Sequence, residues 1–249
     1  MFEVEKEIFP DFPRTQHLPS LGEYIPNATS DDKIAPYKIW KILAENDIYI
    51  EEKIDGANSG ICHCPELNDN QPLIRNRNYI LRKGYSRKNT PAKLQFTSIW
   101  SWYYTNIEKF KRLNSIIGFD APVYGEWMYQ QSSIFYDKLP SMFIAYDIWD
   151  YHNKRFISTD ITRNALIEAG FSVPPLFKQG RFPLTDLLPL LKQVSSWAAD
   201  EKLQVHTGNH RIEGLYLKVD TQLRYKMVRS DFTPGAAFSN ELKKNLLVK

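Results

Sequence analysis

The sequence predicts an α+β fold, with antiparallel sheets flanked by helices, for three reasons. Short apolar runs of alternating or continuous pattern, typical of half-buried and buried strands, recur along the 249-residue chain. The stretch 92–117 instead has apolar residues at spacings of three and four, which is typical of an amphipathic helix. Several of the strand-like runs contain a charged residue, and charges between buried neighbours indicate a polar cleft.

The composition is that of one large soluble domain. The chain is long enough to bury a substantial core, and no segment of linker composition divides it, so we expect a single domain over 1–249. Lys and Arg number 32 against 29 Asp and Glu, so a nucleic-acid site would require local clustering of basic residues. We find no signal-peptide pattern and no apolar run of membrane-spanning length, and therefore expect a soluble, cytoplasmic protein without a membrane partner.

The first elements lead to a strand that ends at a lysine. Residues 1–30 are rich in proline and polar residues, which predicts an extended N-terminal arm. A short helix is expected within 31–45. The run 48–51 predicts a strand that places Lys53 at its end, and 58–64 is expected to return antiparallel.

Basic residues gather in the next segment, 75–93, which contains no acidic residue. Tyr79 and Tyr85 lie among them, and basic with aromatic side chains is a composition that binds phosphates and stacks on bases. A solvated polar loop would also fit the Asn, Gly and Ser content, but the complete absence of acids favours phosphate binding. The basic residues are Arg75, Arg77, Arg82, Lys83, Arg87, Lys88 and Lys93.

The rest of the chain alternates strands and helices. Gly118 is expected to end the amphipathic helix. Strands are predicted at the continuous or alternating apolar runs 123–128, 142–149, 211–219 and 222–229, the last two forming a hairpin that turns at Asp220-Thr221. Helices are predicted at 158–169, closed by Gly170, within 185–199 and in the basic tail 240–249.

Four of the predicted strands carry a charge within an apolar frame: Lys53, Glu126, Glu213 and Lys226. A single such residue usually occupies a surface-facing strand position. Four of them on separate strands indicate a shared cleft, because an isolated buried charge is costly. Glycines lie close to three of these residues and would let a ligand approach the backbone.

Such a cleft would suit a nucleophilic lysine. A lysine reacts only when its amine is neutral, and nearby cations or a metal ion lower its pKa. Lys226, Arg224 and Arg229, or a divalent ion held by the glutamates, would do this and would neutralise a triphosphate attacked at its α-phosphorus. Tyr146 or Phe143 could stack on a purine.

With these residues in place, the chain resembles the covalent nucleotidyltransferase superfamily of ATP-dependent RNA and DNA ligases and mRNA capping enzymes. The matching motifs occur in the family's order: Lys53-Ile54-Asp55-Gly56, Tyr124-Gly125-Glu126, Tyr146-Asp147-Ile148, 213–218 and 225–229. The segments 12–19 and 30–33 look like the lead-in of the RNA ligase branches. The resemblance implies a nucleotidyltransferase (ATP-grasp-like ligase) fold around a nucleotide cleft. The residues after Arg229 are too few for the C-terminal OB barrel of other members, so none is expected.

The resemblance also implies roles for individual residues. The catalytic set is Lys53, as the adenylated nucleophile, with Asp55 and Lys226. The nucleotide-binding set is Glu51, Glu52, Lys53, Ile54, Arg75, Arg77, Glu126, Tyr146, Lys218 and Lys226, with Tyr146 stacking on adenine. The metal ligands are Glu126 and Glu213. The RNA-binding set is Arg75, Arg77, Arg82, Lys83, Arg87, Lys88, Arg224 and Arg229.

Two details of the last motifs depart from the family. The final basic motif often has two lysines one residue apart, and here the pair is Arg224 with Lys226 or Lys226 with Arg229. Strand alternation favours the first, because those side chains share a face. Lys218 would lie on the opposite face from Glu213 if that strand were regular.

The predicted function is ATP-dependent RNA ligation through a lysyl-AMP intermediate and an adenylated RNA end. ATP is the co-substrate, Mg²⁺ or Mn²⁺ the metal, and RNA with 5′-phosphate and 3′-hydroxyl ends the partner. A protein partner could replace the absent C-terminal domain. The alternatives are a DNA-sealing ligase, a GTP-dependent capping-type enzyme, and a non-catalytic nucleic-acid-binding module that uses 75–93.

Overall fold

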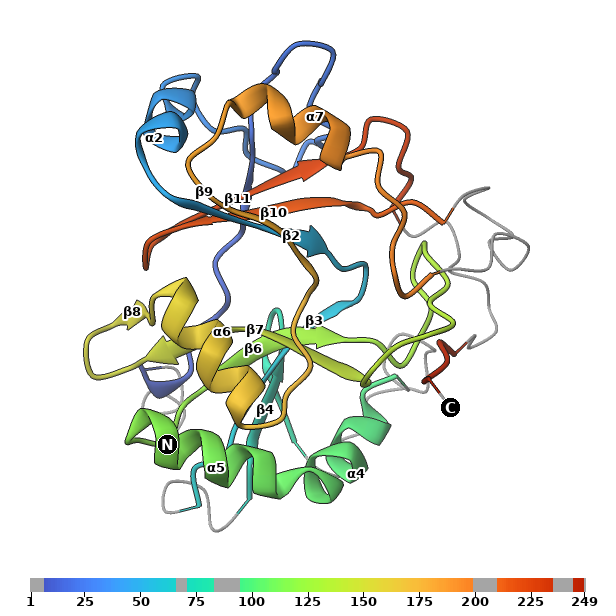
Figure 1. The fold of residues 1–249 in the computed structure, drawn as a ribbon. Coiled ribbons are helices and arrows are strands. Elements are labelled where there is room, and N and C mark those ends of the chain that lie inside the picture. Colours follow the sequence, from blue (N-terminus) through green and yellow to red (C-terminus); the bar gives the residue numbers. More distant parts are fainter. Residues whose placement is uncertain (1–6, 66–70, 83–94, 199–209, 235–243, 249) are drawn as a thin grey trace.

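Two sheets form the framework of the computed structural model, which describes residues 7–65, 71–82, 95–198, 210–234 and 244–248. The five-stranded sheet has the order β1-β11-β10-β2-β9, and the six-stranded sheet has the order β5-β4-β3-β6-β7-β8. The sheets lie one above the other, with α2 and α7 above the first and α4 and α5 below the second (Figure 1). All strand pairs are antiparallel except β1 with β11, so the α+β prediction is confirmed.

The five-stranded sheet packs against helices on one face and leaves polar side chains on the other. Its strands are β1 (Gln16–His17), β2 (Ile48–Lys53), β9 (Leu176–Gly180), β10 (Gly214–Val219) and β11 (Leu223–Val228). In β10, Leu215 and Leu217 are fully buried in a core shared with α2 (Ile39–Glu45) and α7 (Leu187–Leu190). Because strand side chains alternate, Tyr216 and Lys218 face the second sheet.

The six-stranded sheet carries the larger hydrophobic core. Its strands are β3 (Ala57–Cys62), β4 (Leu73–Asn76), β5 (Ile80–Leu81), β6 (Val123–Trp127), β7 (Phe143–Asp150) and β8 (Arg155–Phe156). Three helices cover it: α4 (Thr97–Thr105), α5 (Ile107–Ile117) and α6 (Thr159–Glu168). Phe110 and Leu113 of α5 are fully buried there beside Trp127 of β6. Burying side chains of this size stabilises the helix–sheet contact by about 1.5–3 kcal/mol each.

The helix predictions hold in part. Within the stretch 92–117, residues 92–94 lie outside the described residues, and the rest contains two helices because Asn106 leaves the helical conformation and its side-chain amide donates to Trp102 O, 2.8 Å away. Gly118 ends α5 in the left-handed region, as expected. The helix expected within 185–199 is reduced to the short 3₁₀ turn η1 (Leu184–Asp186) followed by α7.

The expected hairpin between 48–51 and 58–64 is wrong. β2 pairs with β10 and β9, whereas β3 pairs with β4 and β6 in the other sheet. The chain therefore crosses from one sheet to the other immediately after Lys53. Gly56 lies in this crossing, where an added Cβ would approach the Met128 sulfur to 2.5 Å and Glu126 Cβ to 3.0 Å, so a larger residue would displace neighbouring side chains.

The C-terminal hairpin is confirmed and the C-terminal helix is not. β10 and β11 pair from Gly214↔Val228 to Val219↔Leu223 and turn at Asp220, whose φ is 52°. Within the predicted helix 240–249, residues 244–248 are extended and form bridges with the segment after β6. The remainder of that prediction lies outside the described residues. No helix in the described part of the chain is long and apolar enough to cross a membrane.

Candidate functional site

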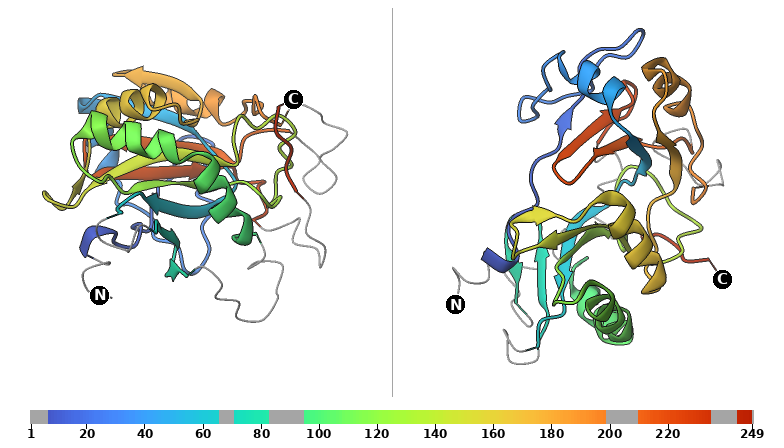
Figure 2. Two further views of the ribbon diagram at one scale, coloured as in Figure 1. Left: turned by 90° about the horizontal axis from the view of Figure 1, so that it is seen from below. Right: turned by 60° about the vertical axis from the view of Figure 1, so that its left-hand side comes forward.

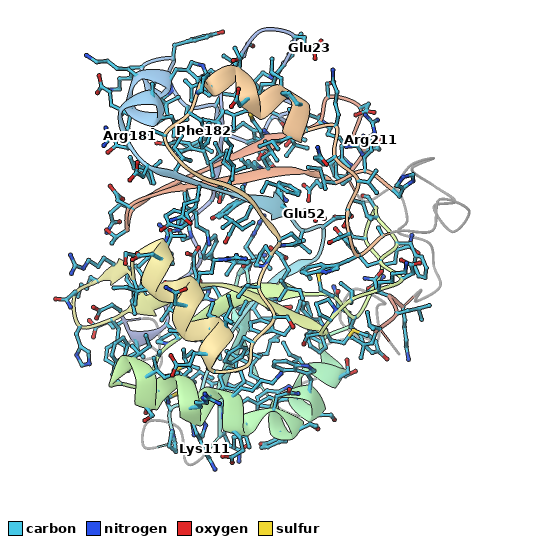
Figure 3. The ribbon with its side chains drawn as sticks, viewed as in Figure 1. Glu23, Glu52, Lys111, Arg181, Phe182 and Arg211 are labelled. Atoms are coloured by element: carbon cyan, nitrogen blue, oxygen red, sulfur yellow. The ribbon has the colours of Figure 1, made fainter. Side chains whose placement is uncertain are left out.

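A pocket of about 830 Å³, partly open to solvent, lies between the two sheets. Figure 3 shows Glu52 near the end of β2, beside the space between the sheets. The lining residues come from both sheets and from the N-terminal arm: Phe12, Arg14, Thr15, Asp32, Lys33, Glu51, Glu52, Lys53, Ile54, Asn58, Arg77, Glu126, Tyr146, Pro174, Tyr216 and Lys226.

Lys53 reaches the pocket at the end of β2. Its Nζ lies 2.6 Å from Oε1 and 2.7 Å from Oε2 of Glu213, which precedes β10 at a bend. Burial lowers the pKa of Lys53, but the carboxylates of Glu213 and Glu126 together raise it by more, so the net pKa lies above the ordinary value. The amine is therefore held as an ammonium in the free protein, and it must lose a proton before it can act as a nucleophile.

Two carboxylates beside Lys53 provide hard oxygen ligands. Burial raises the pKa of Glu126 to about 8 and that of Glu213 to about 7, although Lys53 opposes both shifts. One oxygen of Glu126 is buried without a hydrogen-bond partner among the described residues. These features fit a divalent cation that completes its coordination with phosphate oxygens and water. The described residues contain no group of three or more acidic, histidine or cysteine ligands, so the protein would supply only part of the shell.

A second lysine enters the pocket from β11. Lys226 Nζ lies 2.7 Å from Oδ1 of Asp32, which belongs to the segment after the N-terminal arm. Burial lowers the pKa of Lys226, and Lys53 lowers it further, whereas Asp32 raises it. The pocket therefore contains two ammonium groups on separate strands, each held by one carboxylate.

Aromatic side chains form one wall of the pocket. The Tyr146 hydroxyl accepts a hydrogen bond from Asn58 Nδ2 at 2.6 Å, which fixes the ring on β7. The ring of Tyr216 lies 6.0 Å from that of Tyr146, and the ring of Phe12 lies 5.5 Å from it, edge-on. Such a wall can stack on a planar base.

A network of buried charges lies behind this wall and joins the two sheets. Glu51 of β2 contacts Arg163 of α6 at 2.9 Å and Lys218 of β10 at 2.9 Å. Lys218 Nζ also donates to Tyr146 O at 2.6 Å. Asp147 of β7 accepts two hydrogen bonds from the Arg224 guanidinium, at 3.0 and 2.9 Å. The network fixes the positions of the strands that carry the pocket residues.

The comparisons with known proteins agree with this geometry. The family model for RNA ligase matches residues 46–231, most of the chain. The chain belongs to the RNA ligase family. No curated protein sequence matches it.

Solved structures of a Naegleria gruberi RNA ligase resemble this RNA ligase family member in fold. A lysine variant with ATP and manganese has a TM-score of 0.55 at 15% identity, covering 88% of this chain and 60% of that one. A glutamate variant with AMP and manganese has a TM-score of 0.53 at 15% identity, covering 90% and 65%. The chain thus spans about 60% of the length of the structures it matches.

Most residues predicted for catalysis and nucleotide binding lie together in this family member. Glu51, Glu52, Lys53, Ile54, Arg77, Glu126, Tyr146 and Lys226 all line the pocket. Glu213 contacts Lys53 directly. Asp55 is buried next to them, and its Oδ2 accepts hydrogen bonds from the backbone N–H groups of Ser133 and Ile134. Asp55 therefore fixes the loop after β6, and its carboxylate also interacts electrostatically with Lys53.

Several predicted basic residues are engaged elsewhere. Arg75 is buried and donates to Phe9 O, 2.6 Å away, so it anchors the N-terminal arm to β4. Lys218 and Arg224 belong to the buried network, so both have carboxylate partners within the protein. Arg229 is buried and donates to Ile212 O at 2.6 Å. The predicted nucleotide and RNA contacts of these three residues stay predictions.

The structure gives less information on the other basic residues that were predicted to contact RNA. Arg82 follows β5 and does not line the pocket. Lys83, Arg87 and Lys88 lie outside the described residues. The condition for placing Lys218 opposite Glu213, a regular strand, is not met: Glu213 precedes β10 at a bend, so both side chains reach the space between the sheets.

The sequence reasoning missed the contribution of the arm. Phe12, Arg14 and Thr15 of the arm line the pocket, as do Asp32 and Lys33 of the segment that follows it. The arm runs from the six-stranded to the five-stranded sheet (Figure 2), where β1 pairs with β11. The likeness of 12–19 and 30–33 to the lead-in of RNA ligases was the available signal. Asn58, Tyr216, Pro174 and Arg163 were also missed.

Proposed function

We propose that this protein is an ATP-dependent RNA ligase with a nucleotidyltransferase fold, and that Lys53 carries AMP during the reaction. The observation that supports the proposal is the convergence of Lys53, Lys226, Glu126 and Tyr146 on one pocket between the sheets. A nucleophile, a phosphate-binding cation, a metal ligand and a stacking surface are the parts that nucleotidyl transfer requires. The similar Naegleria gruberi structures with ATP and manganese agree with a nucleotide and a divalent metal as ligands.

In the first step, Lys53 Nζ loses a proton to solvent and attacks the α-phosphorus of ATP. A phosphoramide bond forms between Nζ and the α-phosphorus, the bond to the β-phosphate bridging oxygen breaks, and pyrophosphate leaves. Lys226 binds the α-phosphate and stabilises the charge that develops there. Tyr146 stacks on the adenine. Mg²⁺ or Mn²⁺ bound by Glu126 and Glu213 would supply positive charge that lowers the pKa of the amine and neutralises the phosphates.

The next two steps transfer AMP and seal the RNA. A 5′-phosphate oxygen of the RNA attacks the α-phosphorus of the lysyl adenylate, which releases Lys53 and leaves AMP on the RNA end. The 3′-hydroxyl of a second end then loses its proton, attacks the 5′-phosphorus and displaces AMP. Arg77 lines the pocket and is the predicted basic residue best placed to hold the RNA phosphate.

Covalent labelling with α-labelled ATP and Mg²⁺ tests the first step. The wild-type protein should keep the label on a denaturing gel, and Lys53→Ala should carry none. Lys41→Ala is the matched control, because Lys41 lies on α2 with its side chain 79% exposed, and it should label like the wild type. Absence of label on the wild type, or equal label on Lys53→Ala, would contradict the proposal.

Substrate choice is tested with the same preparation. Label from ATP but not from GTP separates a ligase from a capping-type enzyme. Joining of 5′-phosphorylated RNA ends, measured in competition with nicked DNA, separates RNA from DNA sealing. Steeply salt-dependent RNA binding without any label would instead indicate a non-catalytic binding module.

A further inference from the structure

We propose that Asp32 is a positioning residue for catalysis: it holds the Lys226 ammonium at the pocket wall so that Lys226 can bind the α-phosphate. This inference rests on the proposed function and extends it to a residue of the N-terminal region. Asp32 lies 194 residues from Lys226 in sequence, yet its Oδ1 accepts a 2.7 Å hydrogen bond from Lys226 Nζ. Both side chains line the pocket that contains Lys53.

The backbone around Asp32 is fixed to the strand that carries Lys226. β1 pairs in parallel with β11, with His17 opposite Lys226, and Leu18 N donates to Lys226 O at 2.9 Å. His17 N in turn donates to Lys33 O at 2.8 Å. Asp32 therefore precedes a residue, Lys33, whose carbonyl is hydrogen-bonded to β1. Because β1 pairs with β11, this bond holds Asp32 close to the strand that carries Lys226.

The two oxygens of Asp32 have separate tasks. Oδ2 accepts hydrogen bonds from the backbone N–H of Thr29 at 3.1 Å and from its hydroxyl at 3.0 Å, which closes the local turn. Oδ1 faces Lys226 and lies 3.5 Å from Nε2 of the buried His17. The turn therefore aims one oxygen of Asp32 at the lysine.

Charge explains why Lys226 needs such a partner. Burial lowers the pKa of Lys226, and Lys53 lowers it further, so the ammonium form is disfavoured at this position. Asp32 counteracts both effects, with Glu213 adding a weaker contribution, while burial and Lys226 lower the pKa of His17 to about 4 and keep it neutral. An ammonium has three donors, so Lys226 can keep the bond to Asp32 and still donate to a phosphate.

Asp32→Asn separates the two tasks. The amide oxygen can still accept from Thr29, so the turn is preserved, whereas the amide N–H₂ facing Lys226 cannot accept its hydrogen bond. Asp31→Asn is the matched control, because it removes the same charge from the neighbouring residue. The Asp31 side chain is exposed and does not line the pocket.

The test is the rate of covalent labelling by α-labelled ATP, measured as a function of ATP concentration. We expect Asp32→Asn to label at saturating ATP about 10- to 100-fold more slowly than the wild type, since displacement of a reacting group by about 1 Å costs rates of this order. Asp31→Asn should label at the wild-type rate. In the Lys226→Ala background, Asp32→Asn should have no further effect, because Asp32 acts through Lys226.

Three outcomes would overturn the inference. Asp32→Asn could label as fast as the wild type or faster, which would mean that the phosphate simply displaces Asp32 from Lys226 and that Asp32 does not position the lysine. It could slow labelling further in the Lys226→Ala background, which would mean that it acts independently. It could lower the unfolding midpoint together with the rate, whereas the inference requires an unchanged midpoint. Failure of the wild type itself to label would contradict the proposed function instead.

Discussion

Replacement of Arg224 by alanine should destabilise the fold. The Arg224 guanidinium donates to both carboxylate oxygens of Asp147, at 3.0 and 2.9 Å, and stacks 4.0 Å above the ring of Phe156. The Asp147 side chain is 0% exposed and that of Arg224 is 4% exposed. The pair joins β11 of one sheet to β7 of the other, so its loss leaves a buried carboxylate at the junction of the sheets.

The magnitude follows from the burial of the pair. Breaking a buried ion pair by removing one partner costs about 3–5 kcal/mol. Lys218 Nζ remains 3.6 Å from the same carboxylate and offsets part of that cost. We therefore expect a loss of about 3 kcal/mol, the lower end of that range, which corresponds to a Tm lower by about 6–12 °C for a chain of this size.

Urea unfolding followed by tryptophan fluorescence measures the loss. Arg224→Ala, Asp147→Asn and the double variant form a cycle in which the double variant should lose less than the sum of the single variants. Arg181→Ala is the control, because Arg181 pairs with Asp47 on the surface, 66% exposed, and should change stability by less than about 1 kcal/mol. Its position at the periphery is visible in Figure 3.

The pH dependence provides a second measure of the same pair. Burial raises the pKa of Asp147, but Arg224 and Lys218 lower it more, and the net pKa is below the ordinary value. The stabilisation is therefore fully present above the unfolded-state pKa of about 4 and is lost as pH falls through the lower folded-state pKa.

An unchanged unfolding midpoint for Arg224→Ala, together with weaker RNA binding, would refute the reasoning and assign Arg224 to RNA contact.

Two further predictions concern the strand pair and the metal ligands. Gly214→Ala should lower the free energy of unfolding, measured in urea, by about 3 kcal/mol, because the new Cβ would lie 2.1 Å from a β11 carbonyl oxygen. Gly118→Ala is the comparison: its Cβ would meet no atom within 4 Å, but the residue has a φ of +89°. We expect it to lower the free energy of unfolding by only about 1 kcal/mol. Mn²⁺ affinity, measured by calorimetry, should rise from pH 6 to pH 9, since burial raises the pKa of Glu213 to about 7 and of Glu126 to about 8 and a metal binds the ionised forms. Glu126→Gln should remove the rise above pH 7, and a flat profile in the wild type would contradict the assignment of these ligands.

Features of the fold that depend on local sequence could be predicted. The position of Lys53 at the end of a strand follows from the apolar run before it, and the turn at Asp220 follows from two alternating runs around it. The pairing of β2 and β3 could not be predicted in this way. The choice of sheet depends on partners that are distant in sequence: β2 pairs with β9 and β10, whereas β3 pairs with β4 and β6.

The basic residues show the same limit within the candidate site. Arg75 and Arg77 are equally basic and two residues apart, yet Arg75 is buried against the arm and Arg77 lines the pocket. Sequence composition identifies the cluster but not which members are used as internal partners. The internal partners of Arg224 and Lys218 could not be predicted either, because their carboxylate partners Asp147 and Glu51 lie on distant strands.

Three lysines between the sheets, Lys53, Lys226 and Lys218, are paired with carboxylates, and the burial of each pair indicates whether an entering phosphate can reach the lysine. Lys53 and Lys226 have side chains 23% and 18% exposed, so an entering phosphate can approach them. Lys218 is 1% exposed and its partner Glu51 is 2% exposed, so that pair is structural. Pairing compensates the charges that the apolar strands would otherwise leave buried. Binding a triphosphate at Lys53 would withdraw the ammonium from Glu213, and the freed carboxylate is then available to a divalent cation. Nucleotide and cation should therefore bind this cleft together more tightly than either binds alone.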